Sequence, residues 1–169
     1  VQGLEPGIVE IAAGDDNTCA LNRNGGVYCW GVNSSGQIGD ATEINRFQPV
    51  PVSALSSGVK HITAGGSHTC ALLHSSAMLC WGNNWYGQLG DGTFRDWPSW
   101  VQVAHLRPGV IAIDAGDAHT CALTDSGAMQ CWGGNDDGQL SLGDTEERRT
   151  PADVIGLPEP VSAFSTGVQ

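Results

Sequence analysis

The sequence predicts an all-β fold in which a unit of 51 residues, built from short antiparallel strands, is written about three times. Three observations support this prediction. Glycine provides 24 of the 169 residues and charged residues only 15%, which is typical of many short strands joined by tight turns. The six cysteines form pairs whose members lie ten residues apart, and successive pairs lie 51 residues apart. The segments around the cysteines repeat at the same distance.

The first three strands of a unit are predicted from alternation and from turn residues. In unit one, Ile8–Ala13 alternates in polarity and stops at Gly14. Thr18–Leu21 and Val27–Trp30 flank the turn Asn22–Gly26, which contains the Asn-Gly pair typical of a hairpin.

A fourth strand is predicted near Val50–Leu55. It contains Pro51 and follows Pro49, and because proline cannot donate a backbone hydrogen bond, we expect this strand at the outer edge of its sheet. Four short antiparallel strands in 51 residues is the size of one β-propeller blade. We therefore predict about three and a third blades, which form an incomplete ring on their own.

The predicted domain boundaries follow the repeat. The end of a preceding blade is expected in residues 1–7, three blades in residues 8–57, 58–108 and 109–160, and the first strand of a following blade in residues 161–169. Because both ends fall inside a unit, we interpret the chain as part of a longer array or as a subunit that assembles with other copies. Unit three departs from the pattern, and Ser141-Leu142 is interpreted as an insertion before Gly143-Asp144.

Composition and charge limit the classes of partner. The formal charge is −11 and the sequence pI is near 4.5, so the chain lacks the lysine- and arginine-rich surface on which nucleic-acid affinity depends. It contains no run of 18 apolar residues. We therefore predict no nucleic-acid partner and no membrane span.

The cysteine pairs are expected to form disulfide bonds. A hairpin folded about residue 24 places Cys19 opposite Cys29, within the distance that a disulfide tolerates. Zinc and reduced buried thiols are the alternatives, although a ten-residue step differs from the closer spacing of structural zinc sites. The expected pairs are Cys19 with Cys29, Cys70 with Cys80, and Cys121 with Cys131.

The repeated phrases resemble a known family. Each unit contains a version of A-G-x-x-H-T-C-A-L, then C-W-G-x-N, then G-Q-L-G-D-G, and unit two matches nearly throughout. This pattern resembles the regulator of chromosome condensation repeat, which implies four-stranded propeller blades around a central channel. The cysteine-containing version is similar to secreted bacterial members and to ectodomains of plant receptor kinases, which implies an extracellular location, secreted or at the cell surface. Nothing supports transfer of the nucleotide-exchange activity of the founding nuclear member.

Residues able to carry chemistry recur without forming a catalytic pattern. His68 and His119 each precede a cysteine by two residues, but unit one has Asn17 there, so we expect hydrogen bonds between blades rather than a metal site. The acidic pairs are interpreted as solvated turn carboxylates rather than calcium ligands. No nucleophile elbow, phosphate loop or dinucleotide fingerprint is present. We therefore predict no catalytic, cofactor or metal site and no enzyme activity. The acidic pairs are Asp15-Asp16, Asp136-Asp137 and Glu146-Glu147.

The aromatic residues divide into two sets. Trp30, Trp81 and Trp132 recur with the repeat and are expected to pack between blades. A second set has no counterpart in the other units, so it is a candidate contact surface, the alternative being that these side chains fold back over the blade edge. This second set comprises Trp85, Tyr86, Phe94, Trp97 and Trp100. Asn33 begins an N-glycosylation sequon and is a candidate glycosylation site.

From these features we predict a non-catalytic scaffold, secreted or at the cell surface, that serves assembly through exposed blade edges and loops. The alternative is a recognition module that binds a protein, in the manner of an inhibitor or receptor, or a glycan through its variable loops. A metal-dependent enzyme is the third and least supported hypothesis. The expected partner is a protein, either another copy or a different chain, and a glycan is a further candidate.

Overall fold

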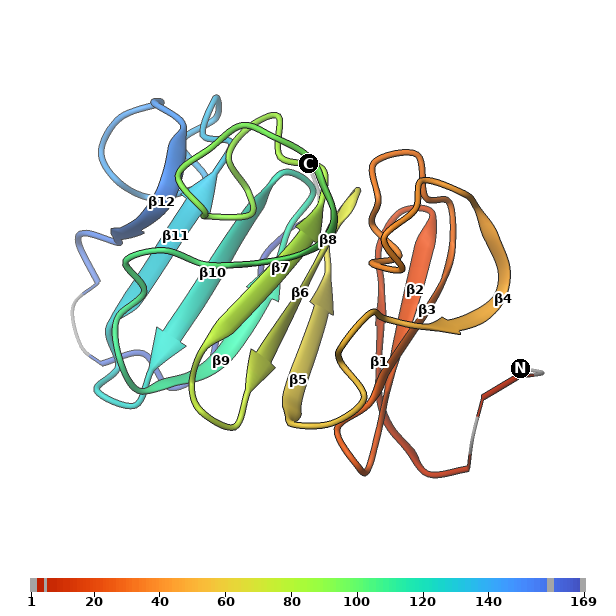
Figure 1. Cartoon of the computed structure of the whole chain (residues 1–169). Coiled ribbons are helices and arrows are strands. Elements are labelled where there is room, and N and C mark those ends of the chain that lie inside the picture. The colour runs from red at the N-terminus through yellow and green to blue at the C-terminus, as the bar shows by residue number, and fades with distance from the viewer. Residues whose placement is uncertain (1–2, 5, 158–159, 168–169) are drawn as a thin grey trace.

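The computed structural model, which describes residues 3–4, 6–157 and 160–167, contains three four-stranded antiparallel sheets that stand side by side (Figure 1). Strands are neighbours in chain order within each sheet. We call the sheets blades one, two and three. Blade one comprises β1 (Ile8–Ala13), β2 (Asn17–Asn22), β3 (Val27–Gly31) and β4 (Arg46–Pro51). Blade two comprises β5 (Val59–Ala64), β6 (His68–Leu73), β7 (Met78–Gly82) and β8 (Trp97–Gln102). Blade three comprises β9 (Val110–Ala115), β10 (His119–Thr124), β11 (Met129–Gly133) and β12 (Arg148–Asp153).

The first strand of each blade lies on the inside of the assembly. Strands β1, β5 and β9 contact one another across the blade boundaries, whereas β4, β8 and β12 form the outer edges. Side chains link these inner strands, since Glu10 Oε2 accepts a hydrogen bond from Ile62 N at 3.3 Å and Thr63 Oγ1 accepts one from Ala115 N at 3.1 Å. The blades are those of a β-propeller whose ring is not closed, so the predicted fold class is confirmed.

The hairpin between β2 and β3 brings the cysteines together as predicted. Asn22 Oδ1 accepts hydrogen bonds from Asn24 N and Gly26 N, each at 2.9 Å, which fixes the turn. Cys19 then lies opposite Cys29 in the strand register. The equivalent hairpins repeat this register, and all three expected disulfides are present with Cα–Cα distances of 4.1, 4.1 and 4.2 Å.

The oxidised state of the six cysteines can be measured directly. We expect the intact mass under denaturing, non-reducing conditions to lie about six hydrogen masses below that of the fully reduced chain. Titration of the denatured chain should then find no reactive thiol. Six reactive thiols would contradict the disulfide pairing.

The fourth strand lies earlier than the prediction. It spans Arg46–Pro51 rather than Val50–Leu55, although it is the outer strand, as expected from its prolines. The chain leaves the sheet after Pro51 because Leu55 N bonds back to Val52 O and Ala54 takes a positive φ of 60°. Val52 and Leu55 are still buried, so their apolar character reflects a packed turn rather than a strand.

The terminal segments contribute no strand within the described residues. Residues 161–169 were predicted to begin a following blade, but Val161–Gly167 forms no strand, and residues 168 and 169 lie outside the description. This segment makes isolated hydrogen bonds instead of a ladder, from Val161 N to Gly127 O and from Thr166 N to Asp114 Oδ2. The described residues among 1–7 are also outside any strand.

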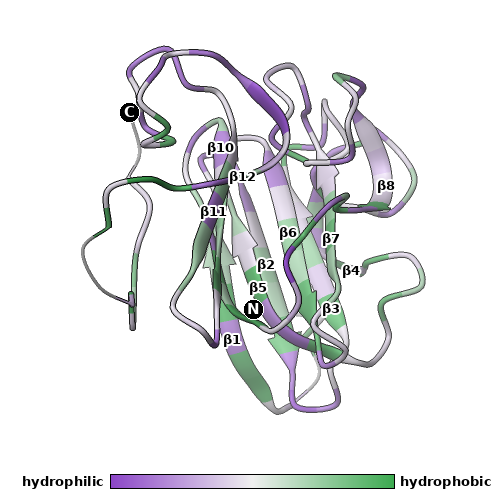
Figure 2. Cartoon of the chain, turned by 90° about the vertical axis from the view of Figure 1, so that its left-hand side faces the viewer, coloured by the Kyte–Doolittle hydropathy of each residue, from purple (hydrophilic) through white to green (hydrophobic). Residues whose placement is uncertain are grey.

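The hydrophobic core lies between the blades as well as within them. One cluster joins Ile38 and Val27 of blade one to Trp81 of blade two, and a second joins Leu89 of blade two to Trp132 of blade three. In Figure 2, hydrophobic colour follows the middle strands of the sheets, and hydrophilic colour is frequent in the connecting loops. Each blade is therefore stabilised by its neighbour, as in other repeat proteins.

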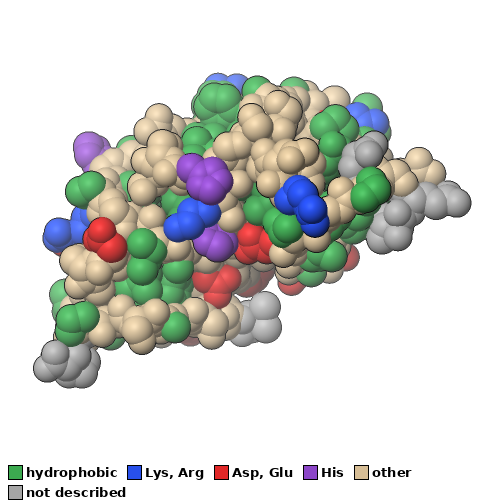
Figure 3. All heavy atoms as spheres, turned by 90° about the horizontal axis from the view of Figure 1, so that it is seen from below, with side chains coloured by type: hydrophobic (Ala, Val, Ile, Leu, Met, Phe, Trp, Pro, Cys, Tyr) green, Lys and Arg blue, Asp and Glu red, His purple; other side chains and the backbone are tan. Residues whose placement is uncertain are grey.

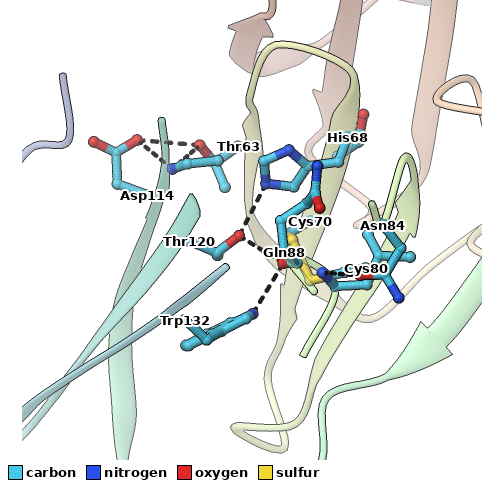
Figure 4. Close-up of a disulfide and its surroundings, with 12 residues drawn as sticks. Thr63, His68, Cys70, Cys80, Asn84, Gln88, Asp114, Thr120 and Trp132 are labelled. Carbon is cyan, nitrogen blue, oxygen red and sulfur yellow. Dashed lines mark hydrogen bonds between the residues drawn. A yellow bond between two sulfur atoms is a disulfide. The ribbon is translucent and has the colours of Figure 1, made fainter. Parts of the chain in front are cut away.

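A hydrogen-bonded tryptophan fixes each blade to the one before it. The indole Nε1 of Trp132 donates to the Gln88 carbonyl oxygen at 2.9 Å, and the Thr120 hydroxyl donates to the same oxygen at 2.8 Å (Figure 4). The prediction that the recurring tryptophans pack between blades is confirmed for this joint and for the one before it. The earlier joint uses Trp81, Thr69 and the Gln37 carbonyl.

His68 completes the joint between blades two and three. Its Nε2 lies 2.9 Å from Thr120 Oγ1 (Figure 4), and because that hydroxyl gives its hydrogen to Gln88, the imidazole is the donor. Asn17 Nδ2 makes the corresponding bond to Thr69 at 3.3 Å in the earlier joint. The predicted role of His68 in hydrogen bonding between blades is confirmed.

A glycine stands beside each of these tryptophans because the indole approaches its backbone closely. A Cβ atom at Gly90 would lie 2.6 Å from Trp132 Nε1, and one at Gly39 would lie 2.7 Å from Trp81 Nε1. Neither position can carry a side chain without moving the tryptophan.

Ser141 occupies the equivalent position in blade three. Its φ of 55° is close to the 70° of Gly90, and its carbonyl accepts a hydrogen bond from Ile155 N as the Gly90 carbonyl does from Ala104 N. The 51-residue register continues to the start of β12. The interpretation of Ser141-Leu142 as an insertion is therefore wrong, because Ser141 replaces the glycine.

Candidate protein-binding surface

Three long connections gather at one end of the blades, toward the top of Figure 1. They join β3 to β4, β7 to β8, and β11 to β12. We call this end the loop end. The hairpins and the connections between blades lie at the opposite end.

A buried asparagine holds each long connection in shape. In blade two, Asn84 has no exposed surface. Its Oδ1 accepts a hydrogen bond from Leu89 N at 2.9 Å, and its Nδ2 donates to Asp91 Oδ1 and Thr93 O, both at 3.1 Å. One side chain thus ties together three parts of the connection. Asn33 and Asn135 do the same in blades one and three.

This role overturns the expected glycosylation at Asn33. The side chain has no exposed surface, and its Nδ2 donates to Thr42 O at 2.9 Å and to Ile44 O at 3.1 Å. Attachment of a glycan would remove these bonds and would need space that the fold does not provide. The folded chain therefore cannot carry a glycan at Asn33.

The same frame displays different side chains in each blade. Two stretches vary while the buried asparagine and its bonds are retained. Equivalent positions hold Ser34-Ser35, Trp85-Tyr86 and Asp136-Asp137 in the first stretch, and Glu43-Ile44, Phe94-Arg95 and Thr145-Glu146 in the second. Blade two therefore presents aromatic residues where blade three presents mainly acidic ones.

Three of the five candidate aromatic residues lie exposed on these connections. Trp85 is 72%, Phe94 45% and Tyr86 38% exposed. Tyr86 lies beside Gly134 of blade three, and the Arg149 guanidinium lies over the Phe94 ring, 5.1 Å from its centroid. Trp85, Tyr86 and Phe94 therefore form a surface, which we call the aromatic surface, next to the connection of blade three.

The other two candidates are held by the blades. Trp97 is half-buried against the core, and its Nε1 donates to Asp91 Oδ2 at 3.0 Å. Trp100 is exposed, but its Nε1 donates to Ser53 O of blade one at 3.1 Å. Folding back over the blade describes Trp97 and Trp100 better than a free contact surface does.

Negative charge is concentrated at the loop end. The turns and long connections there contain twelve acidic residues, whereas the connections of the opposite end contain one acidic residue, Asp125, and two basic residues, Arg23 and Arg107. Seen from below in Figure 3, the opposite end shows lysine, arginine and histidine side chains alongside acidic ones. The twelve acidic residues are Asp15, Asp16, Asp40, Glu43, Asp91, Asp96, Asp117, Asp136, Asp137, Asp144, Glu146 and Glu147.

Some of these acids have internal roles. Arg46 Nε donates to Asp40 Oδ2 at 2.6 Å, and Arg148 forms an ion pair with Asp144 at 2.7 Å. Burial raises the pKa of Asp96, and the charge of Glu43 raises it further, although the Asn84 backbone N–H opposes this change. The negative charge of the loop end thus acts on the pKa of a partly buried carboxyl group, that of Asp96.

A groove lies between the connections of blades two and three. Its volume is about 480 Å³, and it is lined by Phe94, Asp136, Thr145, Glu146, Glu147 and Arg149. Among the described residues, the carboxylates of Asp136, Glu146 and Glu147 form no ion pair. The groove thus combines an aromatic ring with unpaired negative charge.

The described part of the chain contains neither a metal-binding cluster, meaning three or more histidine, cysteine or acidic side chains that could hold a metal ion, nor a helix that could cross a membrane. His68 is engaged between blades, and His119 is 5% exposed.

Comparison with known proteins places this architecture. A model of the Regulator of chromosome condensation (RCC1) repeat matches residues 24–72, 76–123 and 126–169, and a second model of the repeat matches residues 8–37, 59–88 and 110–139. The chain belongs to the RCC1-repeat family. The RCC1-type repeat that the sequence resembles is thus confirmed, and the cysteines that mark its variant form the disulfides.

Curated RCC1-repeat relatives are longer than this chain. The chain is 30% identical to the mitochondrial RCC1 domain-containing protein RUG3 of Arabidopsis thaliana, with 94% of the chain and 36% of the relative covered. It is 35% identical to the ultraviolet-B receptor UVR8 of the same plant, with 87% and 34% covered. It is 39% identical to the probable E3 ubiquitin-protein ligase HERC4 of Homo sapiens, with 89% and 14% covered.

Solved structures share the RCC1-repeat fold. Yeast RCC1 (Prp20), solved with Kap60 bound, superposes with a TM-score of 0.87 at 21% identity over 99% of this chain and 42% of that one. The ectodomain of the Physcomitrella patens receptor kinase CR4 superposes with a TM-score of 0.52 at 24% identity, covering 95% of this chain and 33% of that one.

Proposed function

We propose that this RCC1-repeat propeller is a non-catalytic protein-recognition module that uses the variable connections of its loop end. The observation that carries the proposal is one rigid frame with different exposed side chains in each blade. The buried asparagines fix the backbone of the connections, so the residues displayed on them can differ without loss of the fold. Exposed aromatic residues are typical of the centre of protein interfaces.

We further propose that the module belongs to a secreted or cell-surface protein. The three buried disulfides support this location, because disulfides persist in oxidising compartments and are rare in the cytosol. The relatives differ in their named roles, since they are a mitochondrial protein, a receptor and a probable ligase. The proposed location of this chain therefore depends on its disulfides alone.

The aromatic surface can be tested by giving it the residues of the other blades. The variant Trp85→Ser/Tyr86→Ser/Phe94→Thr carries the residues found at Ser34, Ser35 and Thr145. Peptides selected from a random display library on the wild-type chain should bind this variant at least about tenfold more weakly, since aromatic anchors dominate interface energies. The melting temperature should change little, because the three side chains are exposed.

The control variant is Phe47→Ser, which removes an aromatic residue that is 93% exposed on β4, outside the aromatic surface. It should bind the selected peptides as the wild type does. Selected binders that are indifferent to the triple variant would overturn the proposal. A glycan array probed with the same two variants tests the glycan alternative.

Assembly through the blade faces is a second candidate. Trp30 of blade one is half-buried, whereas its equivalents Trp81 and Trp132 have no exposed surface. Blade three has a cavity of about 350 Å³ on the face that in blade two receives Trp132. Sedimentation at increasing concentration tests this candidate, and a monomer of 17.6 kDa at all concentrations would contradict it.

A further inference from the structure

The charge of the chain selects the chemistry of a partner at the loop end. Twelve acidic residues lie in the connections there, and the basic residues of that end are Arg95 within a connection and Arg46, Arg148 and Arg149 at the starts of strands. Two of these four arginines are taken by ion pairs with Asp40 and Asp144. The loop end therefore attracts positive charge and repels phosphate-rich partners.

The groove concentrates this charge beside an aromatic ring. Asp136, Glu146 and Glu147 line it without an ion pair among the described residues, and all three are exposed. Arg149 already places its guanidinium over the Phe94 ring at 5.1 Å, which shows that a planar cation fits against this side chain. Arg95 stacks over Trp97 in a similar way, at 4.4 Å.

The adjoining aromatic residues provide apolar contact. Trp85 and Tyr86 directly follow Asn84 in the long connection of blade two, and both are exposed. Tyr86 lies beside Gly134 at the edge of blade three. A segment that crosses from blade two to blade three would thus meet aromatic surface first and carboxylates next.

We propose that the loop end binds a basic, extended segment of a partner protein, whose lysine or arginine side chain enters the groove between Phe94 and the carboxylates of blade three while its apolar residues cover Trp85 and Tyr86. This inference rests on the proposed function and adds the chemistry of the partner. Coulombic attraction to three carboxylates and a cation–π contact with the ring hold the charged side chain. Phe94, Asp136, Glu146 and Glu147 set the preference for positive charge.

The probes are three synthetic peptides of equal length that share a Gly-Ser-Leu background and carry arginine, glutamine or glutamate at the same positions. Binding is measured by fluorescence anisotropy with the full chain, at low salt and at about 150 mM salt, where the Debye length is about 8 Å. The arginine peptide should bind at least about tenfold more tightly than the other two. Equal binding of the arginine and glutamine peptides would overturn the inference.

Charge-matched variants separate the groove from general attraction. Asp136→Asn/Glu146→Gln/Glu147→Gln removes three charges from the groove and should weaken binding of the arginine peptide by about tenfold. The control Asp15→Asn/Asp16→Asn/Asp125→Asn removes three exposed charges elsewhere and should change it by less than about twofold. Equal loss in both variants would mean diffuse attraction and would overturn the inference.

A variant that is expected to bind the arginine peptide more tightly complements those expected to bind it more weakly, because misfolding can cause a loss of binding but not a gain. Arg149→Gln removes the cation that already covers Phe94, so the arginine peptide should bind more tightly than it does to the wild type. Weaker binding to this variant would contradict the inference. Library binders that depend on the aromatic surface but lack basic residues would overturn this inference alone, whereas a library with no such dependent binders would overturn the proposed function.

Discussion

Replacing Trp132 with alanine is expected to lower the free energy of unfolding by about 3–5 kcal/mol, the usual cost of truncating a buried tryptophan. The side chain has no exposed surface and fills the interface between blades two and three. The substitution also leaves the Gln88 carbonyl with one hydrogen bond fewer. Because each blade depends on its neighbour, the loss should loosen all of blade three.

Trp30→Ala is the matched control. Trp30 occupies the same position in its own blade but is only half-buried, so its truncation should cost clearly less than that of Trp132. Urea denaturation followed by circular dichroism measures both changes. Equal losses would show that the tryptophans stabilise their own blades and that the contact between blades contributes little.

Stability is expected to fall strongly between about pH 6.5 and about pH 3 because of His68. Burial foremost, and the neighbouring His119 second, lower the pKa of His68 to about 3 from its ordinary value of 6.5. Protonation would place a hydrogen on Nδ1, which is buried and has no hydrogen-bond partner among the described residues.

The sign of the pH dependence of the free energy of unfolding follows from the protons bound at His68 in the two states. Between these two pH values the unfolded chain binds a proton at His68 and the folded chain does not, so the free energy of unfolding rises with pH across this window. The contribution is fully present above about pH 6.5, and its loss on acidification is on the order of 5 kcal/mol. Burial also lowers the pKa of His119 and acts in the same direction. The carboxyl groups of Asp40, Asp144 and Asp153 have pKa values lowered from 3.8, so they begin to lose their contributions only in the acidic part of this window, below about pH 4.

His68→Asn isolates this effect. Asparagine already fills the equivalent position at Asn17, where its amide donates to Thr69, so the variant should keep the bond to Thr120 and remove the titrating group. The urea midpoint of the variant should vary much less between about pH 6.5 and about pH 4 than that of the wild type. An unchanged pH dependence would assign the acid sensitivity to other groups.

The repeat made most of the fold predictable. Alternation located the first three strands, and the position of Cys19 and Cys29 about the hairpin turn was sufficient to predict their pairing. The fourth strand was misplaced because Val52 and Leu55 are apolar for packing in a turn, and sequence periodicity does not distinguish that from a strand. Ser141 was misinterpreted because the sequence does not show why its equivalents, Gly39 and Gly90, are glycines. They are needed where a tryptophan of the next blade approaches the backbone, but in the sequence they look like ordinary turn glycines.

The candidate surface was only partly predictable. Departure from the repeat identified Trp85, Tyr86 and Phe94, which are exposed, but it also selected Trp97 and Trp100, whose indole groups bond to Asp91 and Ser53. The buried asparagines were missed as the frame of the loops, although their recurrence at 33, 84 and 135 was a signal for it. The sequon at Asn33 predicted an exposed, glycosylated side chain, whereas the side chain is buried. A tripeptide motif contains no information on burial.

The exchange of glycine for Ser141 has a consequence for anyone who lengthens this protein by copying its units. A duplicate of residues 58–108 inserted between blades two and three would seat its own tryptophan against Gly90 and offer a second such glycine to Trp132. The same duplicate attached behind blade three would bring its indole against the side chain of Ser141. The array can thus be extended from within by plain copying, whereas an indole placed behind blade three must be accommodated beside the Ser141 side chain, which lines the cavity there.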